Sequence, residues 1–191
     1  MTLRALLDPA GGTALSGTLD VEITGLALDS RRVRPGDAFF ALAGANADGS
    51  AFVRDAERAG AAAVVARRGT AWPPMSATAR IEVEDPRIAL ALAARRFTAD
   101  PATTLDVIAV TGTNGKTTTT YLAMAMLEHA GIAAGVIGTT GVRFRDQVRA
   151  SALTTPDAIA IYESLATLRD DGARALVAPT DSSWPPRCSR T

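Results

Sequence analysis

Residues 107–118 read Val-Ile-Ala-Val-Thr-Gly-Thr-Asn-Gly-Lys-Thr-Thr, an apolar run that leads into a glycine-rich turn. The run 107–110 has the character of a strand buried on both faces of a parallel sheet. A helix is predicted from Lys116 to Ala130, and Gly131 would end it. Glycines let several backbone N–H groups turn toward one anion, and the helix N-terminus adds its positive dipole. The segment therefore predicts a loop that binds phosphate groups.

The residues of this loop have expected roles in binding ATP. Lys116 would reach the outer phosphates as the catalytic residue, and the Thr117 hydroxyl would ligate Mg²⁺. The loop is shorter than the general phosphate-loop pattern, which has glycine where Val110 stands. The alternative is a glycine-rich turn with an exposed lysine. The full set of expected ATP-binding residues is Gly112, Thr113, Asn114, Gly115, Lys116, Thr117 and Thr118.

The use of lysine in this sequence supports a phosphate-binding loop over a simple glycine-rich turn. Of twenty basic residues only Lys116 is lysine, and the others are arginine. A compact ammonium fits between phosphate oxygens in a way that the planar guanidinium does not. A single lysine retained there by chance is the alternative.

Length and composition set outer limits. The chain of 191 residues has room for one large domain or two small ones. Twenty basic residues balance twenty acidic ones, so no nucleic-acid partner is indicated. Cys188 is the sole cysteine, which excludes an internal disulfide and fits a reducing compartment. With no signal-peptide core and no run long enough to span a membrane, we expect a cytoplasmic protein without a membrane partner.

Strands and helices are expected to alternate along the chain, which favours an α/β fold with mainly parallel sheets. Asp85-Pro86 has the chemistry of a helix start, a capping carboxylate followed by proline. The stretch 100–104 has the chemistry of a linker. The expected strands span residues 23–28, 37–43, 61–66, 81–84, 107–110, 134–137 and 173–178, and the expected helices span 52–59, 86–98, 116–130 and 155–171. The expected domains are 1–98, a linker 99–105, a domain 106–178 and a tail 179–191.

Four blocks of sequence, in this order and spacing, resemble the Mur ligases. Within that family the resemblance is to the tripeptide synthetases, which add the third residue of the peptidoglycan stem peptide. It covers Leu3 to Ala178. Besides the short phosphate loop, the blocks are Leu-Asp-Ser-Arg-Arg-Val-Arg-Pro-Gly-Asp at 28–37 with Gly-Ala-Asn-Ala-Asp-Gly at 44–49, Gly-Thr-Thr-Gly at 138–141, and Leu-Thr-Thr-Pro-Asp-Ala at 153–158.

The resemblance implies a small N-terminal UDP-sugar-binding α/β domain at 1–98, followed by a truncated P-loop-type ATPase domain with a parallel sheet. Leu28, Ser30, Ala45, Asn46 and Ala47 would bind the UDP part of the substrate. Its muramyl-peptide end would contact Thr154 and Thr155. From the residues alone, turn capping by Ser30 and Asn46 and helix N-capping by Thr155 remain alternatives.

The resemblance also implies the reaction. An ATP-dependent carbon–nitrogen ligase would add a diamino acid to UDP-N-acetylmuramyl-L-alanyl-D-glutamate, with ATP and Mg²⁺ required. The substrate carboxylate takes the γ-phosphoryl group, and the incoming amine displaces phosphate from the acyl phosphate. Such catalysis rests on positioning and charge neutralisation. The diamino acid (diaminopimelate or lysine) and the oligomeric state are left open.

The tail departs from the family. Thr180 stands where the family has a magnesium-binding glutamate, Trp184 where it has histidine, and no lysine follows Lys116 to be carbamylated. We therefore expect a truncated or frameshifted chain without activity of its own, whose residues 1–98 fold while the remainder is marginally stable. We also expect the strand 173–178 to present an unpaired edge.

Two further alternatives remain. One is a non-catalytic UDP-sugar-binding or nucleotide-binding fragment, or a pseudogene product. The other is a Mur-type ligase acting on folate or cyanophycin. The blocks at 28–37 and 44–49 argue against that second alternative, because they belong to the UDP-binding domain.

Overall fold

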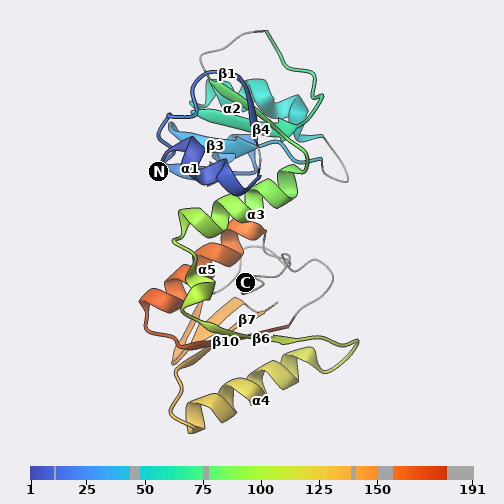
Figure 1. Ribbon diagram of the computed structural model, residues 1–191. Coiled ribbons are helices and arrows are strands. Elements are labelled where there is room, and N and C mark those ends of the chain that lie inside the picture. Colours follow the sequence, from blue (N-terminus) through green and yellow to red (C-terminus); the bar gives the residue numbers. More distant parts are fainter. Residues whose placement is uncertain (11, 44–47, 75–77, 139–140, 150–156, 180–191) are drawn as a thin grey trace. The chain divides into compact units, whose positions relative to one another are not determined.

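The structure is a computed structural model that describes residues 1–10, 12–43, 48–74, 78–138, 141–149 and 157–179. The chain divides into two compact units, Met1–Phe97 and Thr98–Thr191 (Figure 1). Both contain helices packed on a sheet, which is mainly parallel in the first unit and mixed in the second. The predicted α/β fold class is confirmed. Within the described ranges, no helix is long and apolar enough to cross a lipid bilayer.

The sheet of the first unit has the strand order β1-β5-β4-β3-β2. Strands β2 to β5 are parallel to one another, and β1 is an edge strand antiparallel to β5. The strands are β1 (Thr13–Ser16), β2 (Gly25–Ala27), β3 (Asp37–Phe40), β4 (Ala63–Arg67) and β5 (Ala79–Val83). The helices are α1 (Leu3–Leu7), α2 (Val53–Arg58) and α3 (Pro86–Phe97), with 3₁₀ turns η1 (Asp8–Ala10), η2 (Ser30–Arg32) and η3 (Gly49–Phe52).

Alternating strand residues supply both faces of this sheet. Phe39 and Val64 belong to a core with Val53 and Ala56 of α2. Phe40 and its neighbours on the other face are equally buried, and α1 and α3 lie on that side (Figure 1). The result is a three-layer unit in which the carboxyl ends of four parallel strands share one edge.

The start of α3 follows the predicted capping chemistry. The Asp85 Oδ1 atom accepts a hydrogen bond from the Arg87 amide at 2.8 Å. Pro86 is the first residue of the helix, where its missing N–H costs nothing. The prediction of a helix beginning at Asp85-Pro86 is confirmed.

The sheet of the second unit has the strand order β6-β10-β7-β8-β9. β6, β10 and β7 are parallel, and β8 and β9 extend the sheet as an antiparallel hairpin. The strands are β6 (Asp106–Val110), β7 (Ala134–Gly138), β8 (Gly141–Phe144), β9 (Gln147–Arg149) and β10 (Ala175–Pro179). The helices are α4 (Lys116–His129) and α5 (Ala158–Asp170), on opposite faces, with the 3₁₀ turn η4 (Pro101–Thr103).

Two predictions about this sheet are wrong. β6 is not buried on both faces, because Val107 is 41% and Ile108 38% exposed. β10 presents no free edge, because it lies between β6 and β7 with Leu176 and Val177 fully buried. The physical reason is the crossover that inserts β10 between the earlier strands. Within the described residues, the edge strands of this sheet are therefore β6 and β9.

The start of α5 also differs from its prediction. Asp157 is the N-cap, and its Oδ1 atom accepts a hydrogen bond from the Ala160 amide at 2.9 Å. The helix therefore begins at Ala158 and not at Thr155-Pro156, and N-capping of this helix by Thr155 is excluded. Thr154 and Thr155 themselves lie outside the described residues.

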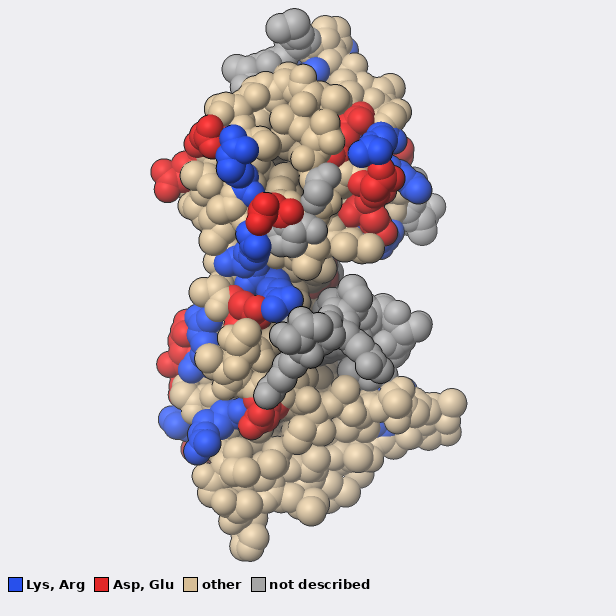
Figure 2. Space-filling view, in the orientation of Figure 1, with Lys and Arg blue, Asp and Glu red and all other residues tan. Residues whose placement is uncertain are grey.

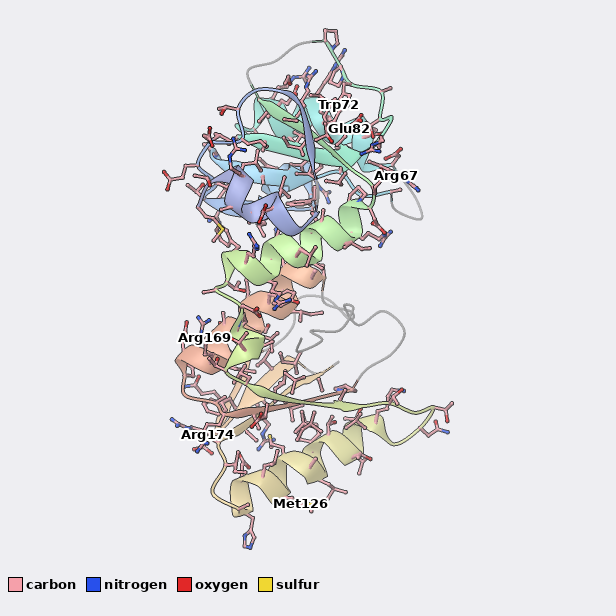
Figure 3. All side chains as sticks on the ribbon, in the orientation of Figure 1. Arg67, Trp72, Glu82, Met126, Arg169 and Arg174 are labelled. Carbon is pink, nitrogen blue, oxygen red and sulfur yellow. The ribbon has the colours of Figure 1, made fainter. Side chains whose placement is uncertain are left out.

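One side of α4 is apolar and exposed. Leu122 is 61% and Met126 73% exposed, one helical turn apart. Figure 2 shows few charged side chains over this part of the second unit, and Figure 3 shows Met126 pointing away from the sheet. A monomeric protein seldom leaves such a stripe uncovered.

Candidate functional site

The glycine loop of the second unit has the backbone that the sequence predicts. The chain leaves β6 at Val110, and α4 begins at Lys116. Gly112 has φ = 151° and Gly115 has φ = 77°, in the region that favours glycine. Both glycines are therefore required by the path of the chain.

The loop offers unused hydrogen-bond donors. The first bond of the helix runs from the Thr119 amide to the Gly115 carbonyl oxygen at 2.9 Å. The amides of residues 112–118 donate no hydrogen bond within the described part of the chain. The N-terminal amides of any helix lack partners in this way, and an anion satisfies them.

Lys116 lies back across this loop. Its Nζ atom donates a hydrogen bond to the Gly112 carbonyl oxygen at 2.5 Å, and its side chain is half-buried. The ammonium is thus held directly over the amide-lined turn. A phosphate oxygen entering the turn would take the place of that carbonyl as its acceptor.

The threonines after Lys116 divide into two kinds. Thr120 is buried, and its hydroxyl donates to the carbonyl oxygens of Lys116 (2.9 Å) and Thr117 (2.8 Å), so it stabilises the helix start. Thr117 and Thr118 are exposed, and their hydroxyls have no partner among the described residues. Mg²⁺ needs few protein oxygens when phosphates supply the others, so a free Thr117 hydroxyl fits that ion. The described ranges contain no cluster of three His, Cys, Asp or Glu residues that could hold a metal.

A second candidate site lies at the carboxyl edge of the first unit's sheet. Ligands of open α/β sheets bind at the carboxyl ends of the strands. Here the ends of β2, β3, β4 and β5 lead into Leu28, Ala41, Arg68 and Glu84. Figure 3 shows Arg67 at this edge of the unit.

At the end of β2, the side chains of Asp29 and Ser30 have different roles. The Asp29 carboxylate caps η2 by accepting from the Arg31 amide at 3.0 Å, and the Arg31 side chain binds it at 2.7 Å. These hydrogen bonds from the Arg31 guanidinium and amide lower the pKa of Asp29 to about 2. Ser30 is 8% exposed, and its hydroxyl has no partner in the described part of the chain. Capping of this turn by Ser30 is therefore excluded, because Asp29 is the cap.

After β3, the chain forms a narrow-based loop. Ala43 and Asp48 form an antiparallel bridge, and the Gly49 amide donates to the Leu42 carbonyl oxygen at 2.9 Å. A Cβ at Gly49 would lie 2.7 Å from the Leu42 backbone nitrogen and oxygen, so only glycine fits. Asp48 Oδ1 accepts from the Ser50 amide at 3.0 Å and caps the following turn. The predicted substrate residues Ala45, Asn46 and Ala47 lie outside the described residues.

Sequence reasoning missed a buried charged cluster that contacts residues 72–74. Arg80 pairs with Glu57 at 2.9 Å, donates to the Pro73 carbonyl oxygen at 2.7 Å, and lies 5.5 Å from the centre of the Trp72 ring. The Trp72 indole N–H donates to Glu82 at 3.1 Å (Figure 3). Residues so far apart carry no local signal that they meet. The cluster holds residues 72–74 against β5.

Comparison with known families decides what these two sites belong to. A family model for the "Mur ligase family, catalytic domain" matches residues 22–98, and one for the "Mur ligase middle domain" matches residues 110–183. The chain belongs to the Mur ligase family. The predicted resemblance is confirmed, and each family model includes one of the two candidate sites.

Individual Mur ligases agree with this assignment. The UDP-N-acetylmuramoyl-L-alanyl-D-glutamate–2,6-diaminopimelate ligase of Mesorhizobium japonicum is 46% identical over 170 residues, 87% of this chain and 34% of that protein. The ligase of the same name from Geobacter sulfurreducens is 41% identical over 180 residues, 94% of this chain and 34% of that protein. The chain thus spans about a third of the length of the curated relatives it matches.

Solved structures of Mur ligases share the fold. A structure of a UDP-N-acetylmuramoyl-L-alanyl-D-glutamate–2,6-diaminopimelate ligase matches with a TM-score of 0.79 and 25% identity, over 95% of this chain and 36% of that one. A MurF ligase from Thermotoga maritima in complex with ADP matches with a TM-score of 0.53 and 25% identity, over 83% of this chain and 32% of that one.

Proposed function

We propose that this chain carries the UDP-sugar site and the ATP·Mg²⁺ site of a peptidoglycan-synthesising Mur ligase. The ligase joins a diamino acid to UDP-N-acetylmuramyl-L-alanyl-D-glutamate in the cytoplasm. Diaminopimelate is the favoured diamino acid, because the relatives at 46% and 41% identity are named for it. A chain with a single cysteine and a need for ATP fits that compartment.

The phosphate loop is the observation that carries the proposal. The amides of residues 112–118 and the Thr117 hydroxyl have no partner among the described residues, and the Lys116 ammonium lies above the same turn. Together they form one polyanion site at a helix N-terminus. A related ligase of this fold is known in complex with ADP. We assign ATP to residues 112–118 and Mg²⁺ to Thr117.

The chemistry of these residues is electrostatic. ATP supplies the phosphoryl group that activates the substrate carboxylate. Lys116 and the loop amides hold the phosphates in line and neutralise the charge that develops on them, which is the main source of catalysis in phosphoryl transfer. The helix holds the donors in place before the reaction begins.

The carboxyl edge of the first unit is assigned to the UDP part of the substrate. Ser30 supports this, because its side chain lies at this edge and its hydroxyl is not bonded within the described part of the chain, so it is available to a ligand. Leu28, Ala45, Asn46 and Ala47 complete the assignment, and the two residues given to the muramyl-peptide end are Thr154 and Thr155.

Calorimetry on the full chain tests the two sites separately. UDP-N-acetylmuramyl-L-alanyl-D-glutamate and MgATP should each bind. Ser30→Ala should weaken only the first ligand and Lys116→Ala only the second, so each variant is the control for the other. A phosphate-release assay with diaminopimelate then separates an enzyme from a binding module, because the module binds without turnover. Absence of binding by either ligand contradicts the proposal.

A further inference from the structure

The buried residue Thr120 binds two carbonyl oxygens at the start of α4. Thr120 is 1% exposed, so its hydroxyl is shielded from water. The Oγ1 atom donates to the carbonyl oxygens of Lys116, at 2.9 Å, and Thr117, at 2.8 Å. A hydroxyl has one hydrogen to donate, so the two carbonyls share it in a three-centre bond.

These two carbonyls belong to peptide groups that also carry amides of the phosphate loop. A peptide group is planar, and in its trans form the C=O and N–H point in opposite directions. The Lys116 carbonyl therefore shares a rigid group with the Thr117 N–H, and the Thr117 carbonyl shares one with the Thr118 N–H. Neither N–H donates a hydrogen bond within the described residues. A hydrogen bond accepted by the carbonyl fixes the direction of the N–H and makes it a stronger donor.

The competing explanation is a bond that only satisfies the buried hydroxyl, because serine and threonine inside helices often donate to a carbonyl one turn earlier. Ser164 of α5 is such a case. Its Oγ atom donates to the Ala160 carbonyl oxygen at 2.7 Å. The Ile161 N–H, at the other end of that peptide group, already donates to the Asp157 carbonyl oxygen at 3.0 Å. Of the two hydroxyls, that of Thr120 alone binds peptide groups whose N–H groups are left for a ligand.

We propose that Thr120 is a positioning residue for the phosphate groups of ATP. By holding the carbonyls of Lys116 and Thr117, it aims the Thr117 and Thr118 amides at the phosphate oxygens without touching the ligand itself. The inference rests on the proposed function, which assigns residues 112–118 to ATP.

The test compares Thr120→Val, Thr120→Ser and Ser164→Ala in the full chain by calorimetry with MgATP. Valine has nearly the shape of threonine but no hydroxyl, so Thr120→Val should weaken MgATP binding about fivefold, equal to about 1 kcal/mol. Thr120→Ser keeps the hydroxyl and Ser164→Ala alters only α5, so both should bind MgATP within about twofold of the unmodified chain. Inorganic tripolyphosphate should show the same pattern, because the loop amides bind phosphate oxygens and not adenosine.

The outcomes separate this inference from the proposed function. Loss of MgATP affinity in Thr120→Val with recovery in Thr120→Ser supports the inference. If the unmodified chain binds MgATP and Thr120→Val binds it equally well, the inference is overturned and the proposed function stands. Equal losses in Thr120→Val and Ser164→Ala, or in Thr120→Val and Thr120→Ser, would also overturn it, because the Thr120 hydroxyl would then not be the cause.

Two further results are decisive. If Thr120→Val does not fold, the pair Thr120→Ala and Thr120→Ser makes the same comparison, since these variants differ only in the hydroxyl. Equal MgATP affinity in that pair overturns the inference, and weaker binding by Thr120→Ala supports it. An unmodified chain without affinity for MgATP overturns the proposed ATP site and this inference together.

Discussion

Replacing Glu57 by alanine should be among the most destabilising single changes in the first unit. The Glu57 and Arg80 side chains are only 11% and 7% exposed, and they pair at 2.9 Å. Without Glu57, the Arg80 guanidinium stays buried with a charge that the carbonyl oxygens of Pro73 and Pro74 only partly satisfy. Removing one partner of a buried pair costs about 3 to 5 kcal/mol. Because the hydrogen bonds to the two carbonyl oxygens remain, we expect the free energy of unfolding to fall by about 3 kcal/mol, at the lower end of that range.

For a unit of this size, such a loss lowers the melting temperature by about 12 to 24 °C. Trp72 fluorescence can follow the unfolding, in a background where Trp184 is changed to phenylalanine. Asp55→Ala is the matched control on the same helix, because its pair with Arg58 is exposed and contributes at most about 1 kcal/mol. A loss below about 1 kcal/mol in Glu57→Ala, or equal losses in both variants, would refute the reasoning.

Three further predictions concern the Asp29 cap, the exposed apolar side chains of α4 and the relative stability of the two units. The Arg31 guanidinium holds the pKa of Asp29 at about 2, so the stability from this cap is present above pH about 4 and is lost as the pH falls through about 2. Arg31→Ala should raise that pKa toward 3.8 in an NMR titration, and an ordinary Asp29 pKa in the unmodified chain would contradict this. The double change Leu122→Gln and Met126→Gln removes exposed apolar side chains from α4, so it should reduce aggregation and the binding of a dye for apolar surface, with little change in melting temperature. Unchanged aggregation would show that these two side chains are not its cause. Limited proteolysis should cleave the second unit before the first, and uniform resistance would argue against a marginal second unit.

What could be predicted from the sequence was mostly local. The glycine loop is contiguous, and Gly112 and Gly115 meet a backbone requirement that no other residue meets as well. Asp85-Pro86 likewise encodes the start of α3 within two residues. Such signals need no knowledge of distant contacts.

The sequence-based predictions were wrong where two local structures suit the same residues, or where a contact between distant residues decides the structure. An apolar run such as 107–110 looks the same in a central strand and in an edge strand, and only the insertion of β10 beside it decides. Thr155 and Asp157 are both good N-caps, and the structure uses the second. The β8–β9 hairpin was missed because Arg145, with φ = 52°, occupies a turn position that glycine usually marks.

The site in the first unit was only partly predictable for the same reason. The candidate site lies at the ends of four strands, so the residues that follow them are spread from Leu28 to Glu84. The sequence blocks predict Ser30 and the segment 44–49 as part of the site, and this stays a prediction. The hydrogen bond that the Arg87 guanidinium donates to the Ala43 carbonyl oxygen, 44 positions away, could be found only in three dimensions.

Titration of the full chain with MgATP tests the central claim most directly, because the account depends on residues 112–118 binding a triphosphate. The unmodified chain should bind one equivalent, and Lys116→Ala should weaken binding at least about tenfold. Lys116→Arg should also lose affinity, because a planar guanidinium does not replace a compact ammonium among phosphate oxygens. Folded protein without affinity for MgATP, or with affinity unchanged in Lys116→Ala, would contradict the account.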